Sequence, residues 1–317
     1  MEKKTEGRKA MRILFFGTSD FAKKPLEALI KSNQFEVVGL VSTPDAKGKR
    51  GKKLIQPPTK ELALKYGLEV FQPEKLKTEE TLNKIKAFGA DLFVVVSYGK
   101  FIPNEMLKLP KMSINIHPSI LPKYRGPSPI NYALLNGDEY TGVSLIDVID
   151  RMDAGDVYMQ WIERIDPNDN YETLHNRLSE IGARMILCAL ENIDSLKPRP
   201  QDESLATYTK IIKKEDGKID FENETAREIV NKIRAFYVWP TAYFYLDGKL
   251  FKIFEAEEVK TDIKKPAQVI KVSKKELIIG CRENAISIKT IQPQSKKAMP
   301  IEAFLAGYKL NVGQVIQ

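Results

Sequence analysis

The chain is poor in the side chains that build metal centres and disulfide frameworks. Its 317 residues include only two histidines and two cysteines. Cys188 and Cys281 lie far apart, without the spacing of zinc ligands. We therefore expect no disulfide framework and no metal site, which favours a cytoplasmic protein. No apolar run approaches the roughly 20 residues that a membrane span requires, so no membrane partner is expected.

Two phosphate-binding motifs are also missing. The sequence has neither a Gly-x-Gly-x-x-Gly fingerprint nor a Walker-type lysine motif. Residues 17–20 follow an apolar run and precede a helical pattern, so Ser19 or Asp20 is expected to cap that helix. These features argue against a nicotinamide-dependent dehydrogenase.

The first ten residues carry four basic and two acidic side chains. They lack the apolar core of a signal peptide, and the acids argue against a transit peptide. We expect residues 1–10 to be a disordered leader, with the native start at Met1 or at Met11.

Length and composition predict two domains, because 317 residues exceed one typical compact unit. A polar, proline-rich stretch begins at Lys197, after a helical pattern over 171–193. We expect a catalytic domain at 11–196, a linker at 197–210 and a second domain at 211–317. Of the net charge of +8, residues from Leu205 onward carry +6, which favours a polyanionic partner for the second domain.

The first domain alternates strand and helix patterns, which predicts an α/β fold with an open, mostly parallel, Rossmann-like sheet. Strands are expected at 12–17, 35–42, 91–96 and 112–117, and helices at 20–30, 59–66 and 78–88. Ligands of such sheets bind outside the carboxyl ends of the strands.

The second domain shows one helical pattern, at 225–235, and several short strand patterns. The strands are expected at 242–246, 249–255, 267–272, 276–280 and 285–289. Five short strands predict a small, OB-like β-barrel, which is a frequent nucleic-acid-binding scaffold.

Polar and apolar residues alternate at the carboxyl end of the strand at 112–117. Asn115 and His117 alternate with two isoleucines, so their side chains point the same way, and Pro118 ends the strand. Together with Asp153, 36 residues further on, they could hold an oxyanion and take a proton from an amine. The alternative is that Asn115 and His117 are ordinary strand-end groups bonded to backbone.

Two loops and the second histidine complete the candidates. Residues 118–130 contain four prolines and a glycine, which predicts an ordered loop suited to the wall of a small-molecule pocket. Residues 45–53 contain five basic residues and two glycines, so we expect neither helix nor strand there; the alternative to a binding role is a solvated loop. His175 lies in a helical pattern and is expected to be structural.

These motifs resemble those of the folate-dependent formyltransferases and, within them, the methionyl-tRNA formyltransferases. The resemblance follows the same order over nearly the whole chain. It rests on Phe16–Phe21, Asn115-x-His117, Ser119–Pro122, Arg125-Gly126, Asp153–Asp156 and Gln292–Met299. Two departures, Ile120 where leucine is usual and Ser19 where proline is usual, change no chemical group.

The resemblance implies formyl transfer from 10-formyltetrahydrofolate to the α-amine of methionyl initiator tRNA, without a metal. Asn115 would donate to the oxyanion, and His117 would donate beside it or protonate the leaving nitrogen. Asp153 would hold His117 or a relay water and take the amine proton. The tetrahydrofolate-binding loop is implied to be Ser119, Ile120, Leu121 and Pro122.

The resemblance also implies that the basic loop at 45–53 enters the acceptor end of the tRNA. The residues expected to contact tRNA are Lys49, Arg50, Lys52 and Lys53 in this loop and Lys296 and Lys297 in the second domain. An arginine that is usual at the place of Ala46 is missing. The protein is expected to act as a monomer.

Several other functions remain open at this point. A sugar amine or glycinamide ribonucleotide could be the formyl acceptor, or the chain could be a formyl-folate hydrolase domain. A nucleic-acid-binding protein without catalysis is a further alternative. The second domain and the basic loop argue against glycinamide ribonucleotide, and the presence of Asn115, His117 and Asp153 argues against loss of catalysis.

Overall fold

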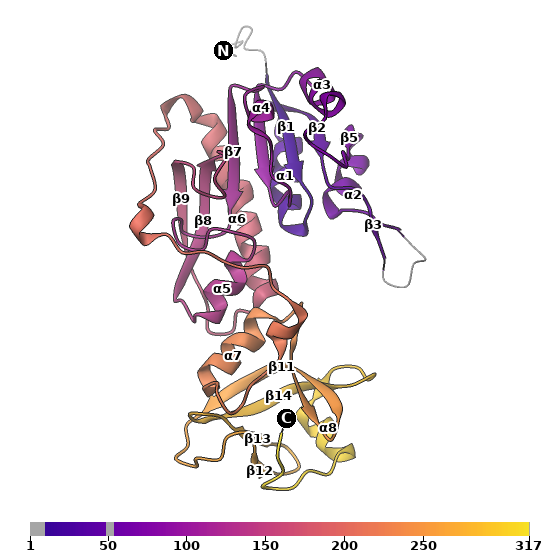
Figure 1. The fold of residues 1–317 in the computed structure, drawn as a ribbon, viewed down its shortest axis with the longest axis vertical. Helices are drawn as coiled ribbons and strands as arrows, with labels where there is room; N and C mark the ends of the chain where they lie inside the picture. The colour runs from indigo at the N-terminus through magenta and orange to yellow at the C-terminus, as the bar shows by residue number, and fades with distance from the viewer. Residues whose placement is uncertain (1–9, 49–53, 317) are drawn as a thin grey trace, which may run out of the picture. The chain divides into compact units, whose positions relative to one another are not determined.

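The computed structural model describes residues 10–48 and 54–316. The leader expected at 1–10 lies outside the described residues, except for Ala10. The chain forms two compact units, each built from three stretches (Figure 1). The first unit comprises Met1–Gly126, Thr141–Glu163 and His175–Tyr208, and the second comprises Pro127–Tyr140, Arg164–Leu174 and Thr209–Gln317.

A seven-stranded sheet forms the centre of the first unit, in the order β5-β2-β1-β6-β7-β8-β9. The first five of these strands pair in parallel, and β7 pairs antiparallel with β8. The mostly parallel α/β sheet predicted from the sequence is therefore confirmed. Its strands are β1 (Met11–Gly17), β2 (Phe35–Val41), β5 (Val70–Phe71), β6 (Leu92–Val96), β7 (Met112–His117), β8 (Tyr140–Asp147) and β9 (Val157–Arg164).

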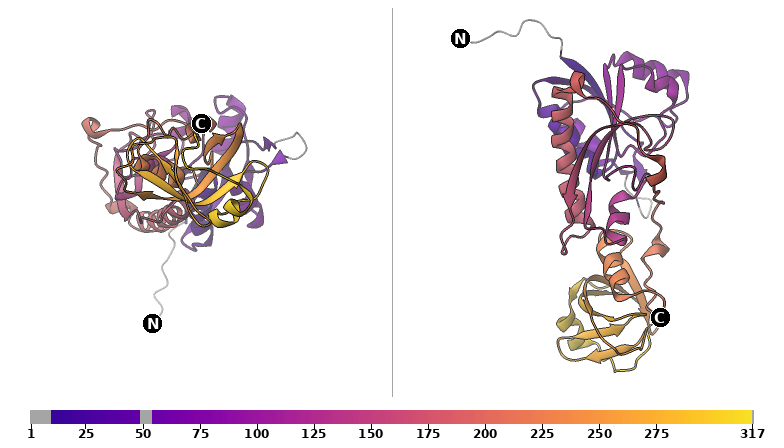
Figure 2. Two further views of the ribbon diagram at one scale, coloured as in Figure 1. Left: turned by 90° about the horizontal axis from the view of Figure 1, so that it is seen from below. Right: turned by 90° about the vertical axis from the view of Figure 1, so that its left-hand side faces the viewer.

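The helices of this part of the chain are α1 (Lys23–Lys31), α2 (Pro58–Lys65), α3 (Glu79–Ala87), α4 (Asn104–Leu107) and α6 (Tyr171–Glu191). Short 3-10 turns lie at Asp20–Ala22, Ile193–Ser195 and Glu203–Leu205. Figures 1 and 2 show α6 along one face of the sheet. Gly182 makes this approach possible, since a Cβ there would lie 3.0 Å from Ile116.

Two local expectations were wrong. The helix predicted at 20–30 is split into a 3-10 turn and α1, and Ser19 makes no side-chain capping bond. Instead its backbone oxygen accepts from the backbone N–H of Ala22 at 3.1 Å. The expected loop at 45–53 contains a short strand, β3 (Ala46–Lys47), which pairs antiparallel with β4 (Leu54–Ile55). Backbone pairing needs no particular side chains, so charge did not prevent it.

The second unit is built on an antiparallel sheet, in the order β10-β11-β14-β13-β12, with β15 paired to β14. Its strands are β10 (Ala242–Leu246), β11 (Lys249–Val259), β12 (Val269–Val272), β13 (Leu277–Gly280), β14 (Ala285–Pro293) and β15 (Met299–Pro300). All five predicted strands are present. Irregular register between Ile253 and Ala256 interrupts the long β11–β14 pair, and such irregularities bend a strand. The apolar core includes the stacked rings of Phe244 and Phe251.

Helices α5 (Pro129–Leu135), α7 (Ala226–Ala235) and α8 (Ile301–Gly307) also belong to the second unit. Asn131 of α5 donates to the last carbonyl of α7, Ala235 O, at 2.8 Å. Asn231 of α7 donates to the last carbonyl of α5, Leu135 O, at 3.3 Å. Because helix C-terminal carbonyls lack partners within the helix, each helix completes the end of the other.

Candidate active site

Strand β7 positions the two polar side chains that the alternation predicted to share a face. It lies between β6 and β8, with Asn115 opposite Val95 and His117 opposite Ser144. Asn115 is half-buried, and His117 is only 4% exposed. Both lie at the carboxyl edge of the parallel strands, where ligands of such sheets bind.

The carboxylate of Asp153 meets both side chains. Its Oδ1 accepts a hydrogen bond from Asn115 Nδ2 at 3.3 Å and lies 3.5 Å from His117 Nδ1. Its Oδ2 accepts from the backbone N–H of Gly126 at 2.8 Å. The structure therefore brings together the three side chains proposed from the sequence, although Asp153 comes from a different loop.

The histidine ring is oriented by the loop that follows β7. His117 Nε2 lies 2.9 Å from the carbonyl oxygen of Tyr124. A carbonyl oxygen can only accept, so Nε2 carries the hydrogen and Nδ1 faces Asp153. A proton bound at Nδ1 would therefore lie between the imidazole and the carboxylate.

The loop that carries Asp153 has a backbone shape that few residues adopt. Asp153 has a φ of 51°, in the left-handed region where aspartate is tolerated better than most residues. Two residues on, a Cβ at Gly155 would lie only 1.9 Å from Asp147 O, so this position requires glycine. The Asp-Ala-Gly sequence thus permits the close passage of this loop over the end of β8.

Asp147 at the end of β8 is a half-buried acid beside this loop. The hydroxyl of Tyr158 donates to its Oδ1 at 2.6 Å. Burial nevertheless raises the pKa of Asp147, because desolvation disfavours the charged carboxylate.

The Ser119–Pro122 loop is held by hydrogen bonds from the sheet. Ser119 Oγ donates to Lys123 O at 2.6 Å, so this hydroxyl shapes its own loop. The amide of Gln160 donates to Leu121 O at 2.8 Å and to Ser144 Oγ at 2.9 Å. Leu121 is 3% exposed. The loop is therefore a fixed element rather than a mobile one.

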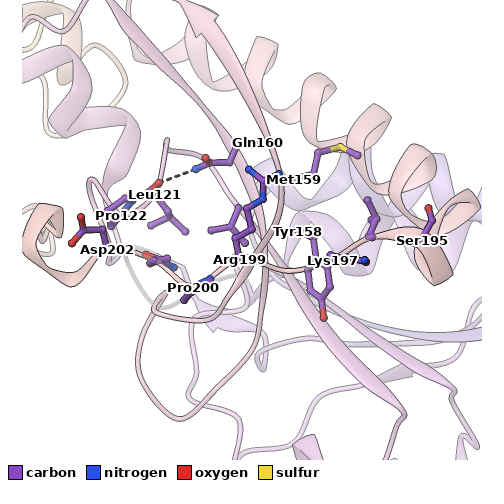
Figure 3. Close-up of a pocket in the computed structure, with 13 residues that line it drawn as sticks. Leu121, Pro122, Tyr158, Met159, Gln160, Ser195, Lys197, Arg199, Pro200 and Asp202 are labelled. Carbon is purple, nitrogen blue, oxygen red and sulfur yellow. Dashed lines mark hydrogen bonds between the residues drawn. The ribbon is translucent and has the colours of Figure 1, made fainter.

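Two of the four loop residues, Leu121 and Pro122, line a cavity of about 790 Å³ (Figure 3). Its other walls come from 157–160 on β9 and from 195–202, and they include the cationic residues Lys197 and Arg199. Ser119 and Ile120 are not among the lining residues. The volume is in the range of about 300–1,000 Å³ typical of small-molecule sites.

Four of the predicted tRNA contacts, Lys49, Arg50, Lys52 and Lys53, lie outside the described residues. The base of their loop is described. Lys60 Nζ contacts both oxygens of Asp45 at 2.9 Å, and Gln72 Nε2 donates to Asp45 Oδ1 at 2.8 Å. Hydrogen bonds from Gln72 and Lys60 lower the pKa of Asp45, so the carboxylate stays charged near neutral pH.

The other two predicted tRNA contacts, Lys296 and Lys297, are exposed on the turn between β14 and β15. Lys296 N donates to Pro293 O at 3.0 Å, and Gln292 Nε2 donates to Lys296 O at 2.8 Å. Ser295 adopts a φ of 62°. The turn has a defined shape that presents two adjacent lysines to solvent.

Among the described residues, no cluster of three or more histidine, cysteine, aspartate or glutamate side chains could hold a metal ion. In the same part of the chain, no helix is long and apolar enough to cross a membrane. His175 packs its ring edge-on against Phe21, with ring centres 5.4 Å apart, as expected for a structural residue.

Sequence reasoning missed two residues next to Asp153. The sequence shows Arg125 only as part of a motif and places Gln201 in the linker expected at 197–210. The structure puts Gln201 Nε2 2.8 Å from Asp153 O and Gln201 Oε1 3.0 Å from Arg125 Nε. The only available signal was Arg125-Gly126 itself, and nothing in the sequence pointed to Gln201.

Comparison with known proteins agrees with this fold. The family model of the formyl transferases matches residues 11–190, and that of the formyl transferase C-terminal domain matches residues 211–309. A sugar 3N-formyl transferase, WlaRD, aligns with a TM-score of 0.64 at 21% identity and covers 92% of this chain and 100% of its own. HypX from Aquifex aeolicus, solved in complex with tetrahydrofolic acid, aligns with a TM-score of 0.61 at 21% identity, over 96% of this chain and 51% of its own. The fold and the two family matches define a formyl transferase.

Relatives with higher sequence identity identify one family within this class. A methionyl-tRNA formyltransferase of Sulfurihydrogenibium sp. is 41% identical over 310 residues, which cover 96% of this chain and 99% of the relative. One from Streptococcus sanguinis is 40% identical over 94% of this chain and 96% of the relative. The chain belongs to the methionyl-tRNA formyltransferase family.

Proposed function

We propose that Asn115, His117 and Asp153 act as one catalytic unit in the transfer of a formyl group to the α-amine of methionyl initiator tRNA. The observation that carries this proposal is the position of Asp153 Oδ1, 3.3 Å from the Asn115 amide nitrogen and 3.5 Å from the His117 ring. One carboxylate oxygen thus contacts both an amide donor and an imidazole that can exchange protons.

The reaction needs one bond formed, one broken and one proton moved. The amine nitrogen attacks the formyl carbon of 10-formyltetrahydrofolate, and the carbonyl electrons move to the oxygen. Asn115 Nδ2 has two hydrogens, so it can keep its hydrogen bond to Asp153 and donate the second hydrogen to this oxyanion. The amine proton passes to Asp153 or His117 Nδ1. The bond from the formyl carbon to the folate N10 then breaks, and N10 takes up a proton.

The hydrogen bond from His117 Nε2 to Tyr124 O favours one of the roles considered for this histidine. Because that nitrogen already has an acceptor at 2.9 Å, the ring acts best through Nδ1. We assign His117 to proton transfer with Asp153 and assign oxyanion stabilisation to Asn115. Loss of one oxyanion donor typically lowers kcat by about 10²–10³.

Folate and tRNA are assigned to separate surfaces. We propose that 10-formyltetrahydrofolate binds against the Ser119–Pro122 loop, supported by the cavity that Leu121 and Pro122 line. The basic loop at 45–53 is proposed to hold the acceptor end of the tRNA, with Arg50 as its main contact. Lys296 and Lys297 are proposed to meet backbone phosphates. We place the reaction in the cytoplasm and expect the protein to act as a monomer. We propose that the catalytic domain spans 11–196 and the tRNA-binding domain spans 211–317.

Single-turnover formylation of charged initiator tRNA tests the catalytic assignment. Asn115→Ala, His117→Ala and Asp153→Asn should each lower the rate by roughly 10² or more. Double variants should fall well short of the product of the single losses, because the three groups act together. His175→Ala is the matched control and should keep the wild-type rate. Glycinamide ribonucleotide, supplied as a control acceptor, should not be formylated.

Circular dichroism and Tm establish that each variant is folded. A folded His117→Ala enzyme with a near wild-type rate would remove the histidine from the mechanism.

A further inference from the structure

Residues 201–208, hereafter the clamp segment, lie against the loop that follows β7. Tyr124 N donates to Thr207 Oγ1 at 2.8 Å, and Arg125 N donates to Thr207 O at 2.9 Å. Thr207 N in turn donates to Pro122 O at 3.2 Å. All of these residues belong to the first unit. The clamp segment is therefore fixed to the same loop whose Tyr124 carbonyl orients His117.

Arg125 is the most deeply buried charge beside the active site, with 1% of its surface exposed. Its guanidinium makes two 3.0 Å bonds to the carboxylate of Glu203. It also donates to Gln201 Oε1 from Nε at 3.0 Å and from Nη2 at 2.8 Å. A buried cation is tolerated only when it is paired and hydrogen-bonded. These bonds fix which end of the Gln201 amide faces the arginine.

The other end of the Gln201 amide points at the Asp153 loop. Its Nε2 donates to Asp153 O at 2.8 Å and to Gly155 O at 2.7 Å. A glutamine satisfies both sides because its oxygen accepts from the guanidinium while its nitrogen donates to two carbonyls. A glutamate here would place a charged acceptor against those carbonyl oxygens.

Asp153 is thus held at both ends by neighbouring residues. Gly126 N holds the carboxylate at 2.8 Å, and Gln201, fixed by Arg125, holds the backbone. The residue has a φ of 51°, a conformation that persists only where its surroundings maintain it. Without Gln201 the loop can relax, and the carboxylate moves relative to Asn115 and His117.

We propose that Gln201, oriented by Arg125 and Glu203, is a positioning residue that sets the geometry of Asp153 for formyl transfer. This inference rests on the proposed catalytic role of Asp153. The hydrogen bonds of Gln201 go to Arg125 and to the backbone carbonyls of Asp153 and Gly155. It acts through the backbone of Asp153.

The test compares Gln201→Met, which keeps side-chain length but loses both donor bonds, with Gln201→Glu and with Ser204→Ala. Ser204 is exposed on the same segment, and its side chain donates only to Asp202 within that segment, so it serves as the control. We expect Gln201→Met and Gln201→Glu to lower kcat about 10- to 100-fold, since small misplacements of catalytic groups cost this much. Because Gln201 also lines the cavity proposed for folate, kcat is measured at saturating 10-formyltetrahydrofolate. The KM for tRNA should change less than about twofold, since Gln201 is not among the proposed tRNA contacts.

Two readouts separate positioning from general destabilisation. The pH profile of kcat should shift in Gln201→Met, because the contact between Asp153 and His117 Nδ1 changes, but not in Ser204→Ala. In an Asp153→Asn background, Gln201→Met should lower the residual rate by less than about twofold. A folded Gln201→Met enzyme with wild-type kcat and pH profile would overturn the inference. So would a rate of the double variant Asp153→Asn/Gln201→Met that is lowered by the full product of the two single losses.

Two further comparisons cover the cases in which Gln201→Met does not fold or Asp153 is not catalytic. If Gln201→Met does not fold, Glu203→Gln loosens Arg125 while leaving Gln201 in place; a several-fold drop in kcat supports the inference, and a wild-type kcat overturns it. If Asp153→Asn itself is fully active, the proposed function fails. If Asp153→Asn is inactive while Gln201→Met is unaffected, only the positioning role fails.

Discussion

His117 and Asp153 form a pair whose proton has one natural location. The carbonyl of Tyr124 occupies Nε2, so exchange with the carboxylate takes place at Nδ1, 3.5 Å from Asp153 Oδ1. Both side chains are largely shielded, with 5% and 15% of their surfaces exposed. In the proposed reaction, an amine that delivers its proton here therefore transfers it to fixed groups rather than to bulk water.

Leu121 offers a test of the folate site. Leu121→Asp places a carboxylate where the side chain is 3% exposed, so it removes apolar contact and buries a charge without a partner. We expect tetrahydrofolate affinity, measured by calorimetry, to fall at least tenfold. Ile120→Leu, which restores the residue usual in the family, should leave it unchanged. Unaltered affinity in a folded Leu121→Asp protein would take this loop out of the site.

At the scale of residues, part of the candidate active site could be predicted from the sequence and part could not. Strand alternation placed Asn115 and His117 on one face because side-chain direction follows from local geometry. Asp153 was a candidate because a carboxylate can take a proton from an amine, but no local rule relates residues 36 apart, so its contact with the other two could not be derived from the sequence pattern. Gln201 was not predicted, because its role depends on the clamp segment folding back onto a loop about 50 residues earlier in the chain. The basic residues at 49–53 remain predictions.

Long, periodic elements were easier to predict than short ones. Strand β7 has the predicted bounds, and the bounds of α2, α3 and α7 differ from the prediction by at most one residue at each end. Their patterns are long and periodic enough to identify. Helix α5 was missed because seven residues after a proline-rich loop give too few turns to show a period. Strand β15, with two residues, depends on its pairing with β14.

The exchange of amides between α5 and α7 predicts a stability effect. Asn131→Ala removes the donor to Ala235 O, and both groups are buried, so the unfolding free energy should fall by about 1–3 kcal/mol. Urea denaturation measures it. Asn33→Ala, at an exposed turn before β2, is the control and should change stability by less than about 0.5 kcal/mol. A loss no larger than the control's would mean that water replaces the bond.

At the scale of the whole molecule, the net charge is concentrated in the second part of the chain, and each unit is built from separate stretches of the sequence. Most of the net positive charge lies from residue 205 onward, while the proposed catalytic groups lie in the first unit. Deleting everything after residue 210 would not isolate a role of the second unit in tRNA binding. It would also strip α5 of its partner α7, since both helices belong to the second unit. Surface substitutions avoid this difficulty.

The turn lysines provide such a test. The double variant Lys296→Gln/Lys297→Gln should weaken tRNA binding and reduce the slope of log Kd against log salt by about 1–2, because each lost phosphate contact releases fewer counterions. Lys264→Gln/Lys265→Gln removes the same charge from another exposed site of the second unit and should leave the slope nearly unchanged. Equal slopes in both double variants would show that net charge, not these two residues, sets tRNA affinity.

The arrangement of the second unit has a consequence while the protein is being made. Helix α5 ends at Leu135, but α7, which supplies the carbonyl that Asn131 binds, ends only at Ala235, 100 residues later. At roughly 5–20 residues per second, the ribosome takes about 5–20 s to deliver that partner. During this interval α5, in which Ile130, Ala133 and Leu134 are buried in the finished fold, lacks its partner helix α7. The nascent chain therefore passes through a period in which α5 is complete but unpaired. A slower rate of translation would lengthen this period.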